Sequence, residues 1–546
     1  MIPHLESIHV DVLSQIAFFT VASTPFDGLG AILQLLLCSR RIYNALCLKS
    51  CPQLYARVFR TRFDLVAHLR RNKLSSPTTT ALASEFHRRC MVLQRIRRSQ
   101  VPQHSILPDL WTIYLMLLES DGMNESQLHA AGIAQYVLML FKCHLGQLGG
   151  LHDITARALT ISIACLVWSH KFIIHLPAEE RGQMLAELRP FVTGSINVPS
   201  PHVHNRTTRR CPPNGLSNRA VGACIPNKHR ALVFSFYSKE HTLTAPSLLS
   251  ASIFLTFALK EATALQVPKH LPTQAIARAT ERHGPTMEDF LIITRRRTPL
   301  LADSVYQSSF RECFADRAGR KIRASRSLAH DEEFYRIARR LDFSENTWEL
   351  RACIGLLSGT WEGISQDITI IVLQPIQCRL EEHLCFSPCV PLPSVSQDSD
   401  FGQSAFQHLY MNGCEGAAKA NEFSYATGAP KHRYELFRPS DTSENDRDPR
   451  QALDVVITGE TPRMLDAAWG AYIFFGRIRL SDGLVTLTRK PKYSGDEGRG
   501  TWIFEGYIHG RRSFVGRWRS FGASKDESLR GIFSLTKVEE PASHLD

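Results

Sequence analysis

Apolar residues near the amino end of the chain recur at the spacing of amphipathic helices. Ile8, Val12 and Ile16 lie four residues apart, which places them on one face of a first helix. The second stripe comprises Ile32, Leu35, Leu36, Tyr43 and Leu46, and the third, after Pro52, comprises Leu54, Tyr55, Val58, Phe59 and Phe63. About sixty residues bury too little surface to be comfortably stable alone, so we expect these three helices to pack against a neighbour.

The middle of the chain keeps a helical period. Residues 84–186 contain strong helical segments at 110–118, 133–141 and 154–168, and helices are predicted again at 247–265 and 331–341. Residues 191–230 are rich in Pro, Asn, His and Arg, which is typical of a long loop or a boundary.

After Cys353 the pattern changes to short strands. A β-branched run occupies 368–372, and residues 377–450 are expected to form a polar insertion. Further strand patterns occupy 453–457, 471–480, 484–489, 501–508, 514–518 and 531–536. Turns are predicted at Ser481-Asp482-Gly483 and His509-Gly510. Short strands joined by glycine turns favour an antiparallel β-sheet or small β-barrel.

These patterns predict a multidomain α+β protein. A helical module spans 1–65, a mainly helical scaffold spans 66–352, and an antiparallel β domain spans 353–540. A chain of 546 residues is too long to fold around a single hydrophobic core, which favours several domains. Its apolar content of 44% is normal for a globular protein.

The cysteine pattern and the hydropathy of the chain bear on the cellular compartment in which we expect the protein. Cys47/Cys51 and Cys385/Cys389 are the close pairs among fourteen cysteines, and neither has the two-residue spacing of a common zinc half-site. We expect reduced thiols in a cytoplasmic or nuclear protein, because no secretory signal and no convincing membrane span is visible.

The positive charge is unevenly distributed. Residues 1–352 hold 43 Lys and Arg against 27 Asp and Glu, whereas residues 353–546 hold 21 against 25. The densest part, 295–326, contains Arg295-Arg296-Arg297 and Arg320-Lys321-Ile322-Arg323. Such asymmetry is consistent with a nucleic-acid contact, a nuclear-import signal, or a surface that pairs with acidic partners.

Catalytic motifs are not visible. The sequence contains no Walker phosphate loop, no His-Glu-x-x-His zinc site, no Gly-x-Ser-x-Gly elbow and no dinucleotide-binding glycine fingerprint. His202 and His204 lack a second pair of candidate metal ligands nearby. We therefore expect a non-catalytic protein with neither metal nor cofactor.

The amino-terminal segment resembles an F-box, the small helical module that docks onto the adaptor Skp1 in cullin–RING ubiquitin ligases. The segment Ile8–Leu13 stands where F-boxes have Leu-Pro-x-Asp/Glu-Val/Ile-Leu, with His9 in place of the proline. Cys38–Tyr43 and Pro52-Gln53-Leu54-Tyr55 are similar to the two later F-box signatures. The wider pattern, a helical middle and a β-rich end, resembles a group of fungal F-box-like proteins. The resemblance implies Skp1 binding through Ile8, Val12, Leu13, Ile16, Leu36, Cys38, Ile42, Tyr43, Leu54 and Tyr55.

The β-rich end carries Trp361/Gly363 and Gly516/Trp518 pairs, which resemble the lipocalin-like barrel that some F-box receptors use for recognition. Aromatic residues with arginine dominate protein interfaces, although alternate strand positions must also fill a barrel interior. The candidate target-binding set is Trp361, Trp469, Tyr472, Trp502, Tyr507, Arg517 and Trp518.

The preferred hypothesis is a substrate receptor that binds Skp1, and through it cullin and RING subunits, and presents a target protein from its β domain. Two alternatives remain open at this stage. The barrel could hold a small apolar ligand, or the basic residues could make the chain a nucleic-acid-associated scaffold.

Overall fold

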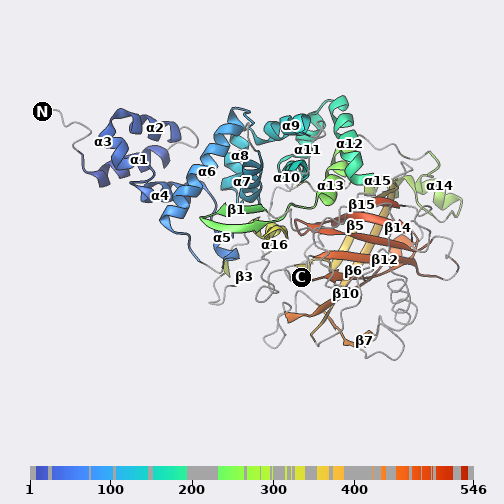
Figure 1. Ribbon diagram of the computed structural model, residues 1–546. Coiled ribbons are helices and arrows are strands. Elements are labelled where there is room, and N and C mark those ends of the chain that lie inside the picture. Colours follow the sequence, from blue (N-terminus) through green and yellow to red (C-terminus); the bar gives the residue numbers. More distant parts are fainter. Residues whose placement is uncertain are drawn as a thin grey trace, which may run out of the picture.

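The computed structural model has a helical amino-terminal part and a carboxy-terminal β-barrel, at opposite ends of the molecule (Figure 1). This agrees with the predicted α+β fold class. The structure describes residues 8–22, 28–72, 75–101, 106–144, 152–193, 232–262, 267, 269–282, 284–295, 298, 300, 314–315, 321–322, 326–338, 353–367, 373–386, 422–423, 432–437, 451–466, 470–480, 483–493, 495, 500–520 and 530–538.

The amino-terminal module consists of short packed helices. They are α1 (Val10–Ala22), α2 (Gly28–Cys38), α3 (Arg40–Leu46), α4 (Pro52–Arg62) and α5 (Val66–Arg71). The prediction of a single second helix is wrong, because the chain forms two helices there, α2 and α3, with a break at Ser39. Ser39 has extended backbone, and its hydroxyl accepts the backbone N–H of Ile42 at 3.3 Å, which caps a new helix. Pro52 opens α4, as expected of a residue without an N–H to lose.

The middle of the chain packs further helices on this module. They are α6 (Thr79–Arg97), α7 (Leu107–Leu118), α8 (Met123–Ala130), α9 (Ile133–His144), α10 (His152–Val167), α11 (His170–His175), α12 (Ala178–Thr193), α13 (Leu248–Glu261), α14 (Gln274–Ala279), α15 (Met287–Arg295) and α16 (Asp331–Ile337), which follows the 3-10 helix η3 (Arg326–His330). The five helical segments predicted from periodicity correspond to α7, α9, α10, α13 and α16. The predicted loop at 191–230 begins late, since α12 continues to Thr193, and most of it lies outside the described residues.

A β-hairpin that the sequence pattern did not indicate lies within the helical part. Strands β1 (Leu232–Phe236) and β2 (Lys239–Leu243) are joined by Tyr237 and Ser238, both with positive φ. Residues with a Cβ adopt this backbone reluctantly, and such turns usually contain Asn and Gly. The turn places Tyr237 in the core, where its ring lies 3.8 Å from that of His68, centroid to centroid.

Eight antiparallel strands of the described chain close the carboxy-terminal barrel. They are β5 (Gly359–Asp367), β6 (Leu373–Cys385), β10 (Asp454–Glu460), β11 (Tyr472–Arg479), β12 (Leu484–Pro491), β13 (Trp502–His509), β14 (Ser513–Ser520) and β15 (Arg530–Lys537). Each pairs with the next in this order, and β15 pairs with β5. The expectation of a small barrel is confirmed.

The prediction of a polar insertion at 377–450 is wrong at its start, because the insertion begins only after β6. Residues 377–385 belong to β6, whose Ile376, Cys378 and Leu380 alternate into the barrel core. Most of the remaining insertion, and the run at 368–372, lie outside the described residues. The short strands β7 (Glu422–Phe423), β8 (His432–Arg433) and β9 (Glu435–Leu436) lie within it, and β9 extends the sheet beside β6. The remaining short pair is β3 (Phe314–Ala315) with β4 (Lys321–Ile322).

Large side chains fill the barrel interior. Trp361, Phe514 and Phe533 are fully buried, and the rings of Phe514 and Phe533 lie 4.8 Å apart. Gly506 and Gly516 face each other across β13 and β14, and a Cβ on either would lie within 3 Å of the opposite backbone. Glycine at this pair therefore permits the close approach of the two strands.

One end of the barrel is closed by residues 353–358. The buried carboxylate of Glu382 accepts the backbone N–H groups of Gly355 at 2.6 Å, Leu357 at 2.5 Å and Ser358 at 3.1 Å. Burial by itself raises the pKa of Glu382, and these N–H donors oppose that rise. The Trp361 indole donates to the Leu357 carbonyl at 2.6 Å, which fixes the same segment over the core.

Candidate functional site

Helix α1 carries two apolar faces, of which only one is buried. Leu13, Ala17 and Val21 point into the core, and Leu13 is 3% exposed. Val12, Ile16 and Phe19 form the second face, and Val12 is 50% exposed. A helix that packed only against its own chain would need one apolar stripe, so the second stripe has no role in the core of the module.

Helices α2 and α3 repeat this arrangement. Ile32, Ile42 and Leu46 are buried, whereas Leu37 is 74% exposed and Tyr43 is 53% exposed. Leu33 and Leu37 are four residues apart and lie on one face of α2. Of the sixteen exposed large apolar residues in the described chain, seven lie between Val10 and Tyr43. We call six of these the apolar docking face: Val12, Ile16, Phe19, Leu33, Leu37 and Tyr43. Val10 is left out because it continues the Leu13, Ala17 and Val21 stripe at the amino end of α1.

The residues that the F-box resemblance assigned to Skp1 divide into two groups. Val12, Ile16, Cys38 and Tyr43 are exposed, and Ile8 and Leu36 are half-buried. The other four, Leu13, Ile42, Leu54 and Tyr55, are buried in the module's own core, so they are not available for direct contact with a partner.

Tyr55 illustrates the structural role of the buried group. Its hydroxyl donates to the Leu46 carbonyl at 2.7 Å, and burial raises the pKa of Tyr55 to about 12. Phe19, Leu33 and Leu37 were not among the residues predicted from the sequence. A second apolar stripe through Val12, Ile16 and Phe19 was the available signal, but a stripe alone does not reveal which face is covered.

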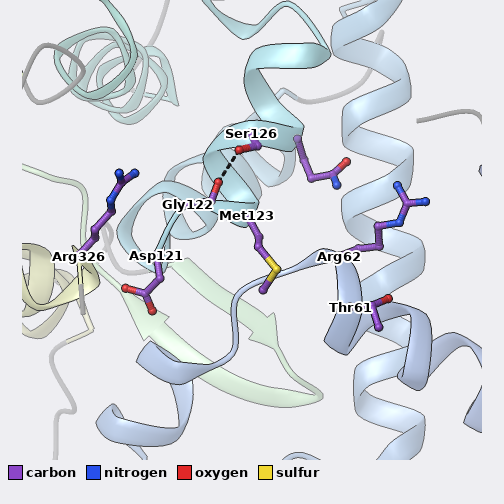
Figure 2. Close-up of a pocket in the computed structure, with 8 residues that line it drawn as sticks. Thr61, Arg62, Asp121, Gly122, Met123, Ser126 and Arg326 are labelled. Carbon is purple, nitrogen blue, oxygen red and sulfur yellow. Dashed lines mark hydrogen bonds between the residues drawn. The ribbon is translucent and has the colours of Figure 1, made fainter. Parts of the chain in front are cut away.

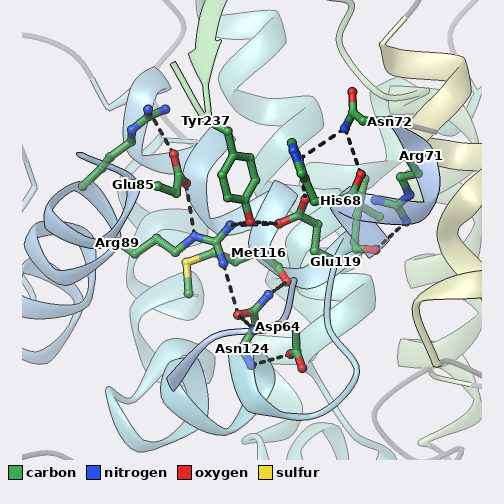
Figure 3. Close-up of polar contacts among 12 residues, drawn as sticks. Asp64, His68, Arg71, Asn72, Glu85, Arg89, Met116, Glu119, Asn124 and Tyr237 are labelled. Atoms are coloured by element: carbon green, nitrogen blue, oxygen red, sulfur yellow. Dashed lines mark hydrogen bonds and ion pairs between the residues drawn. The ribbon is translucent and has the colours of Figure 1, made fainter. Parts of the chain in front are cut away.

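A buried polar cluster joins the module to the middle helices (Figure 3). The Arg89 guanidinium donates to Glu85 at 3.1 Å, to Glu119 at 2.8 Å and to the Asn124 side-chain oxygen at 3.1 Å. Asn124 in turn accepts the backbone N–H of Asp64 at 3.0 Å. Burial would lower the pKa of Arg89, but Tyr237, Glu85 and Glu119 outweigh burial and raise it. This cluster is closed to solvent and the Arg89 guanidinium in it is paired with two carboxylates, which fits a structural junction rather than a reactive site.

A shallow pocket of about 570 Å³ opens beside this junction (Figure 2). Arg62, Asp121, Met123 and Arg326 contribute to its lining. Two backbone N–H groups in the first turn of α8 are already used, because Asn124 donates to Asp64 at 2.8 Å and Glu125 donates to the Ser120 hydroxyl at 3.1 Å. These two groups are therefore not available to an anion in the pocket.

The candidate target-binding residues do not form one exposed surface. Trp361, Tyr472 and Trp518 belong to the barrel core. Tyr507 is buried on the outer wall under the guanidinium of Arg336, and Trp469 lies outside the described residues.

Arg517 holds the barrel to the helical part instead of facing a target. It donates to the carbonyls of Phe191 at 3.2 Å and Val192 at 2.9 Å. Val515 and Ile532 belong to the same core as the helices, beside α13.

Three aromatic residues of the set do gather at the end of the barrel opposite Glu382. The rings of Trp502 and Trp518 lie 4.9 Å apart, and the Arg489 guanidinium lies 3.6 Å from the ring of Tyr472. Arg489 and Trp502 are cross-strand partners, so they share a face. Arg489 was not among the residues predicted from the sequence, because only the strand register places it beside Trp502.

Among the described residues, no group of three or more His, Cys, Asp or Glu side chains is arranged to hold a metal ion. No helix in the described ranges has both the length and the apolar character to cross a membrane. Comparisons of the chain with protein-family models, curated proteins and solved structures give no match.

Proposed function

We propose that this chain is an F-box-like substrate receptor whose amino-terminal module binds a Skp1-type adaptor. The observation that carries the proposal is the second apolar face of α1, formed by Val12, Ile16 and Phe19. Exposed apolar residues concentrated on one small module are typical of a surface that a partner protein covers.

The buried residues of the F-box-like pattern have a supporting role in this proposal. Leu13, Ile42, Leu54 and Tyr55 hold the helices together, so that Val12, Ile16 and Tyr43 keep their positions. Helix α1 packs on α2, α3 and α4, which gives the docking face a fixed base.

The barrel would present the target. Trp502 is half-buried at the barrel end, next to the buried Trp518, Tyr472 and Arg489 that support it. Aromatic and arginine side chains are the types that carry most binding energy at protein interfaces. In this proposal the chain has no catalytic step of its own. The partner RING and E2 subunits transfer the ubiquitin, and this chain holds the target so that its lysine is present near them at a high effective concentration.

The test is co-elution of the purified chain with recombinant Skp1. We expect a stable complex with the wild type and none with Val12→Asp combined with Leu37→Asp. Both side chains are exposed, so this variant should keep the wild-type circular dichroism spectrum and melting temperature. Failure of the wild type to bind Skp1, or binding by the folded double variant, would overturn the proposal.

The two alternatives have less support. Trp361, Phe514 and Phe533 fill the barrel core that a small apolar ligand would occupy. The side chains of 295–297 and 320–323, on which a nucleic-acid scaffold would depend, lie outside the described residues.

A further inference from the structure

Cations border the apolar docking face. Arg40 and Arg41 are exposed in the first turn of α3, and Arg40 is three residues before Tyr43, which places the two side chains side by side on the helix. Lys49, in the connection after α3, and Arg60, on α4, are also exposed.

A further cation lies beside α1. The Arg57 guanidinium lies 4.2 Å from the ring of Phe18 and donates to Gln15 at 3.3 Å. The Phe18 ring is 5.5 Å from that of Phe19, a member of the docking face. A guanidinium therefore lies beside the Phe18 ring of α1, next to Phe19, and another lies beside Tyr43 on α3.

Acidic groups are scarce on the same module. Among its described residues, Asp11 is the exposed carboxylate, and it lies 3.3 Å from the imidazole of His9. The other described carboxylate, Asp64, is 4% exposed and contacts Asn124. The docking face is thus apolar with a positive border, and the complementary surface is apolar with a negative border.

The distribution of these charges favours a protein over a membrane as the partner. Helices that lie on a membrane carry Lys and Arg on the polar face of the same amphipathic helix. Neither α1 nor α2 contains a lysine or an arginine. The cations come from α3, α4 and the connection between them, so they are not carried by the two helices that supply most of the apolar residues.

We infer that the partner which covers the docking face presents Asp and Glu side chains around an apolar groove, and that Arg40 and Arg41 accelerate its association by electrostatic steering. The inference rests on the proposed function, because it assigns this chemistry to the adaptor. Steering of this kind raises association rates by roughly tenfold or more at low salt, and it fades as salt screens the charges.

The experiment measures the association rate of Skp1 with the full chain by stopped flow at about 50 mM and about 500 mM NaCl, because screening differs strongly between these concentrations. The variant is Arg40→Glu with Arg41→Glu. Acidic residues in the first turn of α3 favour that helix, so folding is retained. The matched control is Lys171→Glu with Arg189→Glu, two exposed cations outside the module.

At low salt we expect the association rate of the Arg40/Arg41 variant to be about tenfold below that of the control, and the difference to close at high salt. Equal rates for variant and control would overturn the inference and leave the proposed function standing. No binding by the wild type would overturn both. Burial of the face by a second copy, or by anionic vesicles in place of Skp1, would also overturn the inference; sedimentation velocity and vesicle flotation distinguish these occupants.

Discussion

The guanidinium of Arg71 donates to the carboxylate of Asp331 across 2.8 Å, joining residues 260 positions apart. Arg70 donates to both oxygens of the same carboxylate, at 2.8 and 2.9 Å. Asp331 opens α16, whose next residues face the barrel: Glu332 lies 3.9 Å from Arg511, and Glu333 lies 3.8 Å from His509. Helix α16 therefore connects the amino-terminal module with the β13–β14 turn.

Replacing Asp331 with Asn should weaken this connection. Burial alone would raise the pKa of Asp331, but Arg71 and Arg70 outweigh burial and hold it below its ordinary value. Removing the carboxylate leaves two arginines without their counter-charge, at a cost of about 3 kcal/mol. Urea denaturation measures the change. The control is Glu460→Gln, which removes an exposed pair with Lys492 and should change stability by less than about 0.5 kcal/mol. Equal shifts in the two variants would contradict the role given to Asp331.

Leu13 and Val12 should respond oppositely to truncation. Leu13→Ala leaves a cavity in the module core and should destabilise it by about 3 kcal/mol. Val12→Ala removes an exposed side chain and should change stability by less than about 0.5 kcal/mol, while it weakens adaptor binding. Thermal denaturation and Skp1 titration separate the two effects. A stable Leu13→Ala variant that fails to bind would show that Leu13 itself contacts the adaptor.

Acid should destabilise the chain through His68. Burial, with the charges of Lys239 and His241, lowers the pKa of His68 from 6.5 to about 3. Below pH 6.5 the unfolded chain binds a proton that the folded chain excludes, so stability falls as the pH drops from 6.5 towards 3, by up to about 1.4 kcal/mol per pH unit. His68→Gln should reduce this slope. Parallel pH profiles for wild type and His68→Gln, from urea midpoints between pH 5 and 7.5, would contradict the prediction.

Glu382→Gln should loosen the closed end of the barrel. The glutamine amide places donors against backbone N–H groups that now bind a carboxylate, and burial makes the mismatch costly, at about 3 kcal/mol. Tryptophan fluorescence during thermal unfolding reports the loss, because Trp361 packs against the same segment. Glu381→Gln, at the exposed neighbouring position, serves as the control. A melting temperature equal to that of the control would show that the three N–H contacts contribute little.

The barrel was predictable because its strands alternate. Tyr472, Phe474 and Ile478 are separated by even numbers of residues along the predicted strand at 471–480, and these side chains lie in the barrel core. The hairpin of β1 and β2 was not predictable, because its turn uses Tyr237 and Ser238 where the usual turn signal is Asn-Gly. The contacts that Tyr237 makes with Arg89 and Glu119, at 3.0 and 3.2 Å, come from distant parts of the chain.

The candidate docking residues were only partly predictable for a related reason. Periodicity identifies which side chains share a helical face, and it placed Val12 and Ile16 together correctly. It does not say which apolar face a neighbouring helix covers. Leu13 is next to Val12 in the chain, yet the packing of α1 on α2, α3 and α4 buries one and leaves the other exposed.

The sequence by itself determined that a helical part is followed by a β part, and it located the main helices of the middle region and most of the barrel strands, because these follow from local periodicity. Only the tertiary structure decided the second apolar face of α1, the Arg71–Asp331 connection and the gathering of Trp502, Trp518 and Arg489 at one barrel end. Each of these depends on contacts between distant segments, and burial is a property of the packed chain rather than of any local pattern.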